Sequence, residues 1–242
     1  FVPNNGQGQA EIRFPIYNSP EAAAVNFVHC LCLAFMGSKA YPFDAYNEGI
    51  VRAATMRIAL EALGLIPGKT GGVGTYVRGV VGEMVRIAPE HEYLVAVGHE
   101  SFGEFSDQAP NLQEFNADGR LSRILGAHRY TQTLHQCWQL HKRLRGWRHD
   151  VLHCMMDFPK PPWGARNMIV TVHDIGMSDL AKFWSRLTSG LASLLYRTAA
   201  AKASALITVS YFAAERISDR FSVPMERLHV VYNGLDHARF RR

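Results

Sequence analysis

Three groups of residues in this 242-residue chain have side chains and a spacing that could do chemistry. Gly71, Gly72 and Gly74 come just before an amphipathic segment, and glycines at a helix N-terminus leave backbone N–H groups open to an anionic ligand. His173 and Asp174 follow a strongly apolar segment. An imidazole there can donate a hydrogen bond to a hydroxyl or an oxyanion, and the carboxylate can orient it or bind a hydroxyl. The third group is a basic cluster with one tryptophan, HKRLRGWRH.

Each group also has a purely structural interpretation. The glycines could form a turn that only close packing requires. His173 could pack over a strand end while Asp174 caps the next element. The basic cluster, residues 141–149, could be a solvated helix end or could contact an anionic lipid surface or phosphate groups. One aromatic residue among basic ones gives little support for nucleic-acid binding, so we expect no nucleic-acid partner. His153, inside an apolar segment, is predicted to be a core or edge histidine.

Two nucleotide-binding motifs nearly occur around the glycines. Residues 64–70 (GLIPGKT) have three residues between the glycines, whereas a P-loop needs four, and Pro67 removes a backbone donor. A dinucleotide pattern begins at Gly72, but Val77 stands where its third glycine should be and no acidic residue ends the next strand. The sequence therefore argues against an ATPase and against a nicotinamide-dependent dehydrogenase. It also contains no GxSxG or HExxH motif.

The composition indicates a globular protein. Apolar residues make up 48% of the chain and charged residues 19%, which suits a packed core. The net charge of +5 is compatible with an anionic ligand, an anionic membrane surface, or neither. The four cysteines lack CxxC or zinc spacing, so we expect them to be reduced and the protein to be cytoplasmic. No apolar run reaches the roughly 18 residues of a membrane span, which leaves peripheral contact with the inner membrane face as an option.

Alternating strands and helices must position the candidate residues. The hydrophobic pattern predicts strands at residues 56–63, 93–97, 150–155, 167–172, 205–209 and 228–232. It predicts helices at residues 73–88, 127–144, 180–203 and 211–221. This alternation is typical of a Rossmann-like, doubly wound α/β domain with a parallel sheet and helices on both faces.

Some local details accompany this pattern. The helix at 127–144 is expected to carry Leu134, Cys137, Trp138 and Leu144 on one side. Ser210 is expected to cap the N-terminus of the helix at 211–221, and Asn233 with Gly234 is expected to form a turn. Residues 99–111 are expected to be a loop, and residues 112–126 carry no clear pattern.

Residues 1–55 do not share the alternating pattern. The chain begins at Phe1 instead of methionine, which predicts a processed product or a fragment. We expect residues 1–55 to be an extension outside the domain that is not native to it, with a genuine N-terminal partner element as the alternative. The domain itself is expected to cover residues 56–236.

Six motifs follow one another in an order and at distances that point to one family. They are MRI at 56–58, GGVGTYVR at 71–78, PEHEYLV at 89–95, TVHD at 171–174, ALITVSYFAAERI at 205–217 and VPMERLHVVYNGLD at 223–236. Together they resemble the N-terminal domain of a GT-B fold, family 4 (retaining) glycosyltransferase. The resemblance covers about three quarters of the chain, and residues 205–236 are its most specific part.

The resemblance implies roles for individual residues. His173 matches the family histidine that contacts the transferred sugar and is the catalytic candidate. The glycines match a loop that faces the interdomain cleft, near the acceptor and the donor phosphate. The implied substrate-binding residues are Gly71, Gly72, Gly74, Asp174, Ser210 and Asn233. Residues 237–242 would begin the crossover to a second domain.

The resemblance also implies an activity. Family members transfer a sugar, mannose among others, from a nucleotide-sugar donor to a saccharide or lipid-linked acceptor, as in polysaccharide biosynthesis, and neither a metal nor another cofactor is expected. They continue into a C-terminal Rossmann domain that holds most of the nucleotide-sugar contacts. This chain stops at Arg242, so we expect a truncated fragment that is inactive alone. The alternative is a non-catalytic α/β module that binds a phosphorylated ligand in the same cleft.

Overall fold

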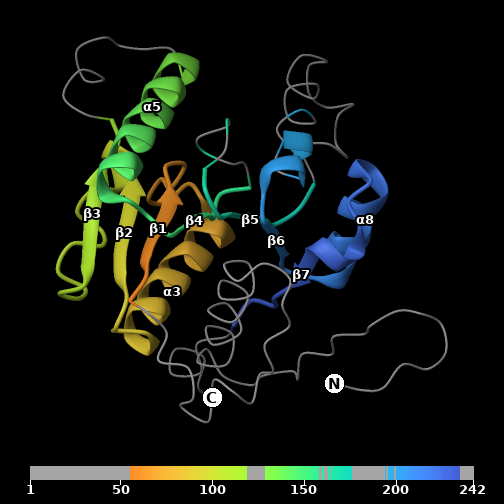
Figure 1. The fold of residues 1–242 in the computed structure, drawn as a ribbon, viewed down its shortest axis with the longest axis horizontal. Coiled ribbons are helices and arrows are strands. Elements are labelled where there is room, and N and C mark those ends of the chain that lie inside the picture. Colours follow the sequence, from red (N-terminus) through yellow and green to blue (C-terminus); the bar gives the residue numbers. More distant parts are fainter. Residues whose placement is uncertain are drawn as a thin grey trace.

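The computed structural model describes residues 55–118, 129–157, 160, 163, 165–175, 194, 196–198 and 200–234. Their centre is a seven-stranded parallel sheet with the strand order β3-β2-β1-β4-β5-β6-β7 (Figure 1). The strands are β1 (Arg57–Ala62), β2 (Glu92–Val97), β3 (Leu112–Asn116), β4 (Val151–Cys154), β5 (Met168–Val172), β6 (Ala205–Thr208) and β7 (Leu228–Val230). The order runs outward from β1 in both directions, which confirms the predicted doubly wound α/β class.

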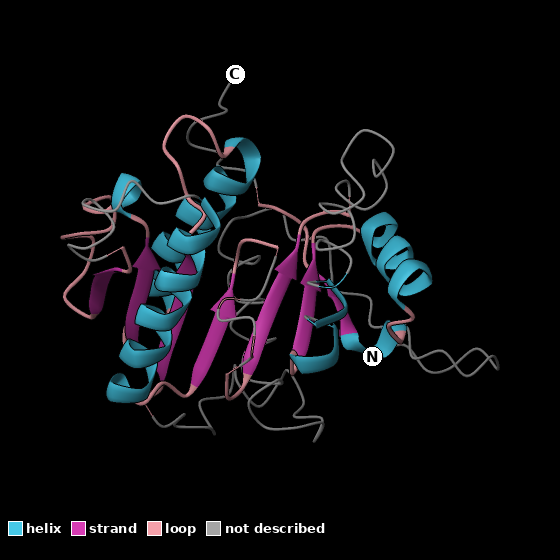
Figure 2. Cartoon of the chain, turned by 90° about the horizontal axis from the view of Figure 1, so that it is seen from above, coloured by secondary structure: helices cyan, strands magenta, loops and turns pink. Residues whose placement is uncertain are grey.

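Among the described residues, helices cover both faces of this sheet. Helix α3 (Gly71–Ile87) packs on one face, whereas α5 (Arg129–Trp147) and α8 (Tyr211–Phe221) pack on the other. Short 3-10 helices, η1 (His99–Ser101) and η3 (Met225–Arg227), precede β3 and β7. Figure 2 shows the strands pointing in one direction, so their carboxyl ends meet at one edge, which we call the C-terminal edge.

The apolar alternation within the strands builds two cores. In β1, Ile58 and Leu60 join the cluster under α3, whereas Ala59 joins the cluster under α5. The strands β4, β5 and β6 are buried at every position. Burial on both faces explains why these strands appear as continuous apolar runs instead of alternating patterns.

The predicted strands are all present within two residues of their expected ends, but β3 was missed. Its sequence, LQEFN, is mostly half-buried at the edge of the sheet, so it carries no apolar run. The helix predicted at 180–203 lies largely outside the described residues, and so does the expected extension at 1–55 apart from its last residue.

Helix α5 confirms the helix expected at 127–144 but corrects its buried face. Cys137 and Leu144 are buried as expected, together with Leu140, whereas Leu134 and Trp138 are exposed by 61% and 50%. The helix also continues to Trp147, which packs into the core. Within the described ranges, none of the helices combines the length and hydrophobicity that crossing a bilayer requires.

Candidate functional site

The candidate residues gather at the C-terminal edge where the strand order reverses. The central strands β1 and β4 pair directly, with Glu61 opposite Cys154. The chain leaves β1 toward β2 on one side, while β4 continues toward β5 on the other. Ligands of open α/β sheets bind at such a switch point, outside the carboxyl ends of the strands.

The first turn of α3 stands at this switch point without a side-chain cap. Thr70 occupies the N-cap position, but its hydroxyl donates to the carbonyl of Ile66 (3.0 Å) instead of accepting from the helix. The first turn contains no acidic residue. The N–H groups of Gly71, Gly72 and Val73 therefore have no acceptor among the described residues. Unpaired N–H groups and the helix dipole together favour an anion at this position.

The glycines lie inside the helix and not in a loop ahead of it, which corrects the predicted helix start at residue 73. Gly71 has a φ of 50°, a left-handed conformation that favours glycine. Gly74 is buried, and a Cβ there would lie 2.5 Å from the Thr70 hydroxyl. A Cβ at Gly72 would meet nothing within 4 Å. Gly74 thus serves close packing, while Gly71 and Gly72 keep the helix end open.

His173 follows β5 and is held on three sides. Its Nε2 lies 3.0 Å from the carbonyl of Met155, which can only accept, so Nε2 carries the hydrogen. Its backbone N–H donates to Asp157 Oδ1 (2.7 Å). The ring of Tyr76, from the second turn of α3, meets the imidazole edge-on with 4.7 Å between ring centroids. His173 is half-buried, and its Nδ1 is left to act as an acceptor when the ring is neutral.

Asp157 is the residue that fixes the backbone of His173. It has a φ of 64°, a strained conformation for a residue with a side chain. Burial raises the pKa of the Asp157 carboxyl, while His173, through its charge and its backbone N–H, lowers it.

A buried polar chain continues beneath the site. The Tyr76 hydroxyl lies 3.2 Å from Thr171 Oγ1, which lies 2.8 Å from His153 Nε2. His153 is fully buried, which confirms its prediction as a core histidine. Burial, with a smaller effect of His173, lowers the pKa of His153 to about 3, so its ring is neutral at physiological pH.

The remaining predicted site residues lie at the same edge but farther along it. Asp174 is exposed, and its carbonyl accepts a hydrogen bond from Tyr196 (2.9 Å). Ser210 caps α8 as predicted, because its hydroxyl accepts from the Ala213 N–H (3.1 Å). Asn233 is exposed and lies in irregular chain after β7, not in the expected turn. Since β7 is two strands beyond β5, the end of β7, which Asn233 follows, is about 10 Å along the edge from β5.

No group of three or more His, Cys, Asp or Glu side chains within the described part of the chain is arranged to hold a metal ion. Cys137 and Cys154 are buried free thiols, and burial raises the pKa of Cys137 to about 11. Cys30 and Cys32 lie outside the described residues.

Comparison with known proteins fits this geometry. The family model described as Glycosyltransferase Family 4 matches residues 70–239, more than half of the chain. The chain belongs to this family. The match begins at the N-cap of α3, so it includes the glycines, His173 and Ser210. No curated protein matches the chain significantly.

This glycosyltransferase domain also holds a carboxylate that the sequence analysis did not single out. Glu61, the second-last residue of β1, is fully buried, accepts from the Leu63 N–H (2.8 Å) and lies 3.6 Å from Lys160 Nζ. Burial raises the pKa of Glu61, against the lowering effect of Lys160. The pair ties the loop after β4 to the end of β1, and the same loop supplies Asp157 to His173. The available signal was a charged residue inside an apolar strand.

Proposed function

We propose that the domain is the acceptor-side part of a retaining glycosyltransferase that uses a nucleotide-sugar donor. The acceptor would be a saccharide or a lipid-linked glycan, and mannose is one sugar that fits the family resemblance. In the reaction, the bond between the anomeric carbon and the donor phosphate breaks and the acceptor hydroxyl oxygen bonds to that carbon. The acceptor proton is released, and the nucleoside diphosphate leaves.

One observation carries the proposal. The open first turn of α3 lies next to His173, since Tyr76 in the second turn contacts the imidazole directly. The unpaired N–H groups supply donors for the negative charge that develops on the leaving diphosphate. His173 is fixed by Met155, Asp157 and Tyr76, so its Nδ1 is positioned to accept a hydrogen bond from a hydroxyl of the transferred sugar or the acceptor.

No metal or cofactor is part of this proposal, because backbone N–H groups and basic side chains can neutralise the diphosphate. The nucleotide itself would be held largely by a second domain, as the resemblance implies. We place the protein in the cytoplasm, where nucleotide sugars would reach the C-terminal edge, with peripheral membrane contact if the acceptor is lipid-linked.

The test uses the full-length protein and a panel of UDP-, GDP- and dTDP-hexoses with saccharide and lipid-linked acceptors. Release of nucleoside diphosphate reports transfer, and the anomeric proton coupling of the product reports retention. His173→Ala should reduce transfer about 100-fold, the size expected for losing one well-placed polar group. His141→Ala, on the outer part of α5, is the matched control and should transfer normally.

Near-normal transfer by His173→Ala would contradict the assignment of this site. Tight binding of a nucleoside diphosphate without turnover on any donor would favour the alternative, a non-catalytic module for a phosphorylated ligand. Circular dichroism of both variants shows whether a loss of transfer comes from unfolding.

A further inference from the structure

A second candidate site lies at the opposite edge of the sheet, where the strands begin. A hollow of about 400 Å³ is formed by the end of α5 and the segments that lead into β4 and β5. Its walls are Leu144, Arg145, Arg148, His149, Asp150 and Arg166. Since β4 spans four residues, this hollow is separated from the C-terminal edge by about 13 Å of strand.

The hollow carries an excess of unpaired positive charge. No carboxylate among the described residues forms an ion pair with Arg145, Arg148 or Arg166. Asp150 is the single acidic residue in the lining, and its Oδ2 accepts from the Arg57 backbone N–H (2.8 Å). Three arginines and one partly engaged carboxylate therefore line the hollow.

These arginines are not needed to cap the end of α5. The carbonyl of Leu144 accepts from the Arg148 N–H (3.0 Å), with His149 Nδ1 3.4 Å away, and the carbonyl of Trp147 accepts from Arg57 (3.2 Å). These contacts satisfy two carbonyls of the last turn without using a guanidinium group of the lining. The guanidinium groups of the lining thus remain available to a ligand.

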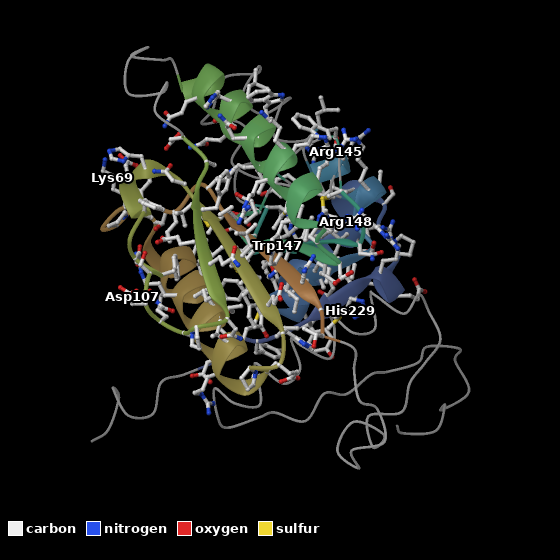
Figure 3. All side chains as sticks on the ribbon, turned by 60° about the vertical axis from the view of Figure 1, so that its left-hand side comes forward. Lys69, Asp107, Arg145, Trp147, Arg148 and His229 are labelled. Carbon is white, nitrogen blue, oxygen red and sulfur yellow. The ribbon has the colours of Figure 1, made fainter. Side chains whose placement is uncertain are left out.

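The shape of the hollow follows from how the chain reverses. Trp147 packs into the core, and Arg148 has a φ of 56°, which turns the chain sharply toward β4. Figure 3 shows Arg145 and Arg148 at this end of α5, well away from Lys69, which precedes α3. The basic cluster predicted from the sequence is therefore divided, with Trp147 buried and the arginines at the rim of a concave pocket.

His149 forms one wall of the hollow. Burial lowers its pKa, against the raising effects of the carbonyls of Leu144 and Arg166 and of the nearby Asp150. The carbonyl of Arg166 is nearby, but the buried Nε2 forms no hydrogen bond of normal geometry within the described part of the chain. A ligand hydroxyl could donate a hydrogen bond to Nε2 of the neutral His149 ring. A charged ligand oxygen could accept one from Nε2 of the protonated ring.

We propose that this hollow binds the phosphate group of a small, soluble phosphorylated ligand, at a site separate from the one where sugar transfer takes place. Guanidinium groups match phosphate oxygens through charged, directional hydrogen bonds. A hollow of 400 Å³ is large enough for a diphosphate or a sugar phosphate. The proposal does not depend on the transfer reaction.

The test measures binding of inorganic pyrophosphate to the full-length protein by isothermal titration calorimetry at fixed ionic strength. The double variant Arg148→Gln/Arg166→Gln should weaken binding at least about tenfold, because each lost charge-assisted hydrogen bond is worth about that factor. Lys142→Gln removes the same type of charge from the exposed part of α5, outside the hollow. This control should change the affinity less than about twofold.

Two results would overturn the proposal. Unchanged affinity in the double variant would mean that pyrophosphate binds elsewhere, for example at the first turn of α3. An equal loss of affinity in Lys142→Gln would mean that pyrophosphate responds only to the overall positive charge of the protein.

A parallel experiment measures sedimentation with phosphatidylglycerol vesicles. Vesicle binding that depends on Arg148 and Arg166, without pyrophosphate binding, would replace the soluble ligand with a lipid surface. Thermal unfolding of each variant confirms that the fold is kept.

Discussion

The ring of Tyr76 meets the imidazole of His173 edge-on, with an angle of 85° between the ring planes. This contact joins two segments nearly 100 residues apart, the second turn of α3 and the residue after β5. It also places the hydroxyl of Tyr76 on Thr171, two residues before His173. Tyr76 therefore acts as the support that keeps the histidine next to the open helix end.

Substitutions at Tyr76 should separate these two contacts. Tyr76→Phe removes the hydrogen bond to Thr171 but keeps the ring, so we expect a loss of about 1 kcal/mol in the free energy of unfolding and little change in transfer. Tyr76→Ala removes the support of His173 and should reduce transfer at least about tenfold. Urea unfolding and donor turnover measure the two effects. Equal transfer by both variants would show that the ring contact does not position His173.

Gly74 lies close to the Thr70 hydroxyl, so substitutions at these two positions should have non-additive effects on the free energy of unfolding. Gly74→Ala places a Cβ against the Thr70 hydroxyl, which must leave its carbonyl acceptor on Ile66. We expect this variant to lose about 1 kcal/mol of stability. In a Thr70→Ala background only the end of the flexible Arg78 side chain, 2.9 Å from the new Cβ, has to shift. The same substitution should then cost less or be neutral, because alanine favours a helix over glycine.

The control for this cycle is Gly72→Ala, whose Cβ meets no atom. Its unfolding free energy should stay within about 0.5 kcal/mol of the wild type. A loss of stability at Gly72 as large as that at Gly74 would contradict the packing described for the first turn of α3.

Substitutions at Ser210 test whether this residue, which the family resemblance assigns to substrate binding, has a structural role instead. Its hydroxyl already caps α8, so Ser210→Ala should cost about 1 kcal/mol of stability and Ser210→Gly only a few tenths. Both variants should transfer sugar at nearly the wild-type rate when measured well below their unfolding temperature. A large fall in transfer with unchanged stability would instead assign Ser210 to the substrate site.

The buried His153 should make the free energy of unfolding depend on pH. Its pKa falls from 6.5 to about 3 on folding, so the unfolded chain binds a proton that the folded one excludes. Stability from this residue is present above pH 6.5 and is lost as the pH falls toward 3, by about 1.4 kcal/mol per pH unit. His153→Gln removes this titration. The difference in unfolding free energy between wild type and variant should shrink with acidification, and parallel curves would contradict the assignment.

The sequence predicted the elements whose residues carry a strong local signal. The apolar run before His173 predicted β5 and so placed the histidine at the C-terminal edge. The strand β3 was missed because Gln113 and Glu114 interrupt its short apolar pattern. The start of α3 was placed two residues late, because glycines oppose a helix locally while packing of the whole face favours it.

The residues that hold the site in place could not be predicted from local sequence patterns. Asp157 reaches His173 through a left-handed backbone turn, and nothing in the residues around it announces that conformation. Glu61 is visible as a charge in an apolar strand, but its partner Lys160 lies 99 positions along the chain, between two prolines. Contacts of this range depend on the strand order, which local patterns do not specify.

The central pairing of β1 with β4 has a consequence for how the protein folds. Arg57 and Asp150, which open this pairing, are 93 residues apart, and such non-local parallel contacts form slowly. The strands β1 to β3 and β4 to β7 can each begin to associate before the two groups meet. The first turn of α3 belongs to one group and His173 to the other, so neither group alone contains the site. During refolding, helical circular dichroism should therefore return before the ability to bind a diphosphate.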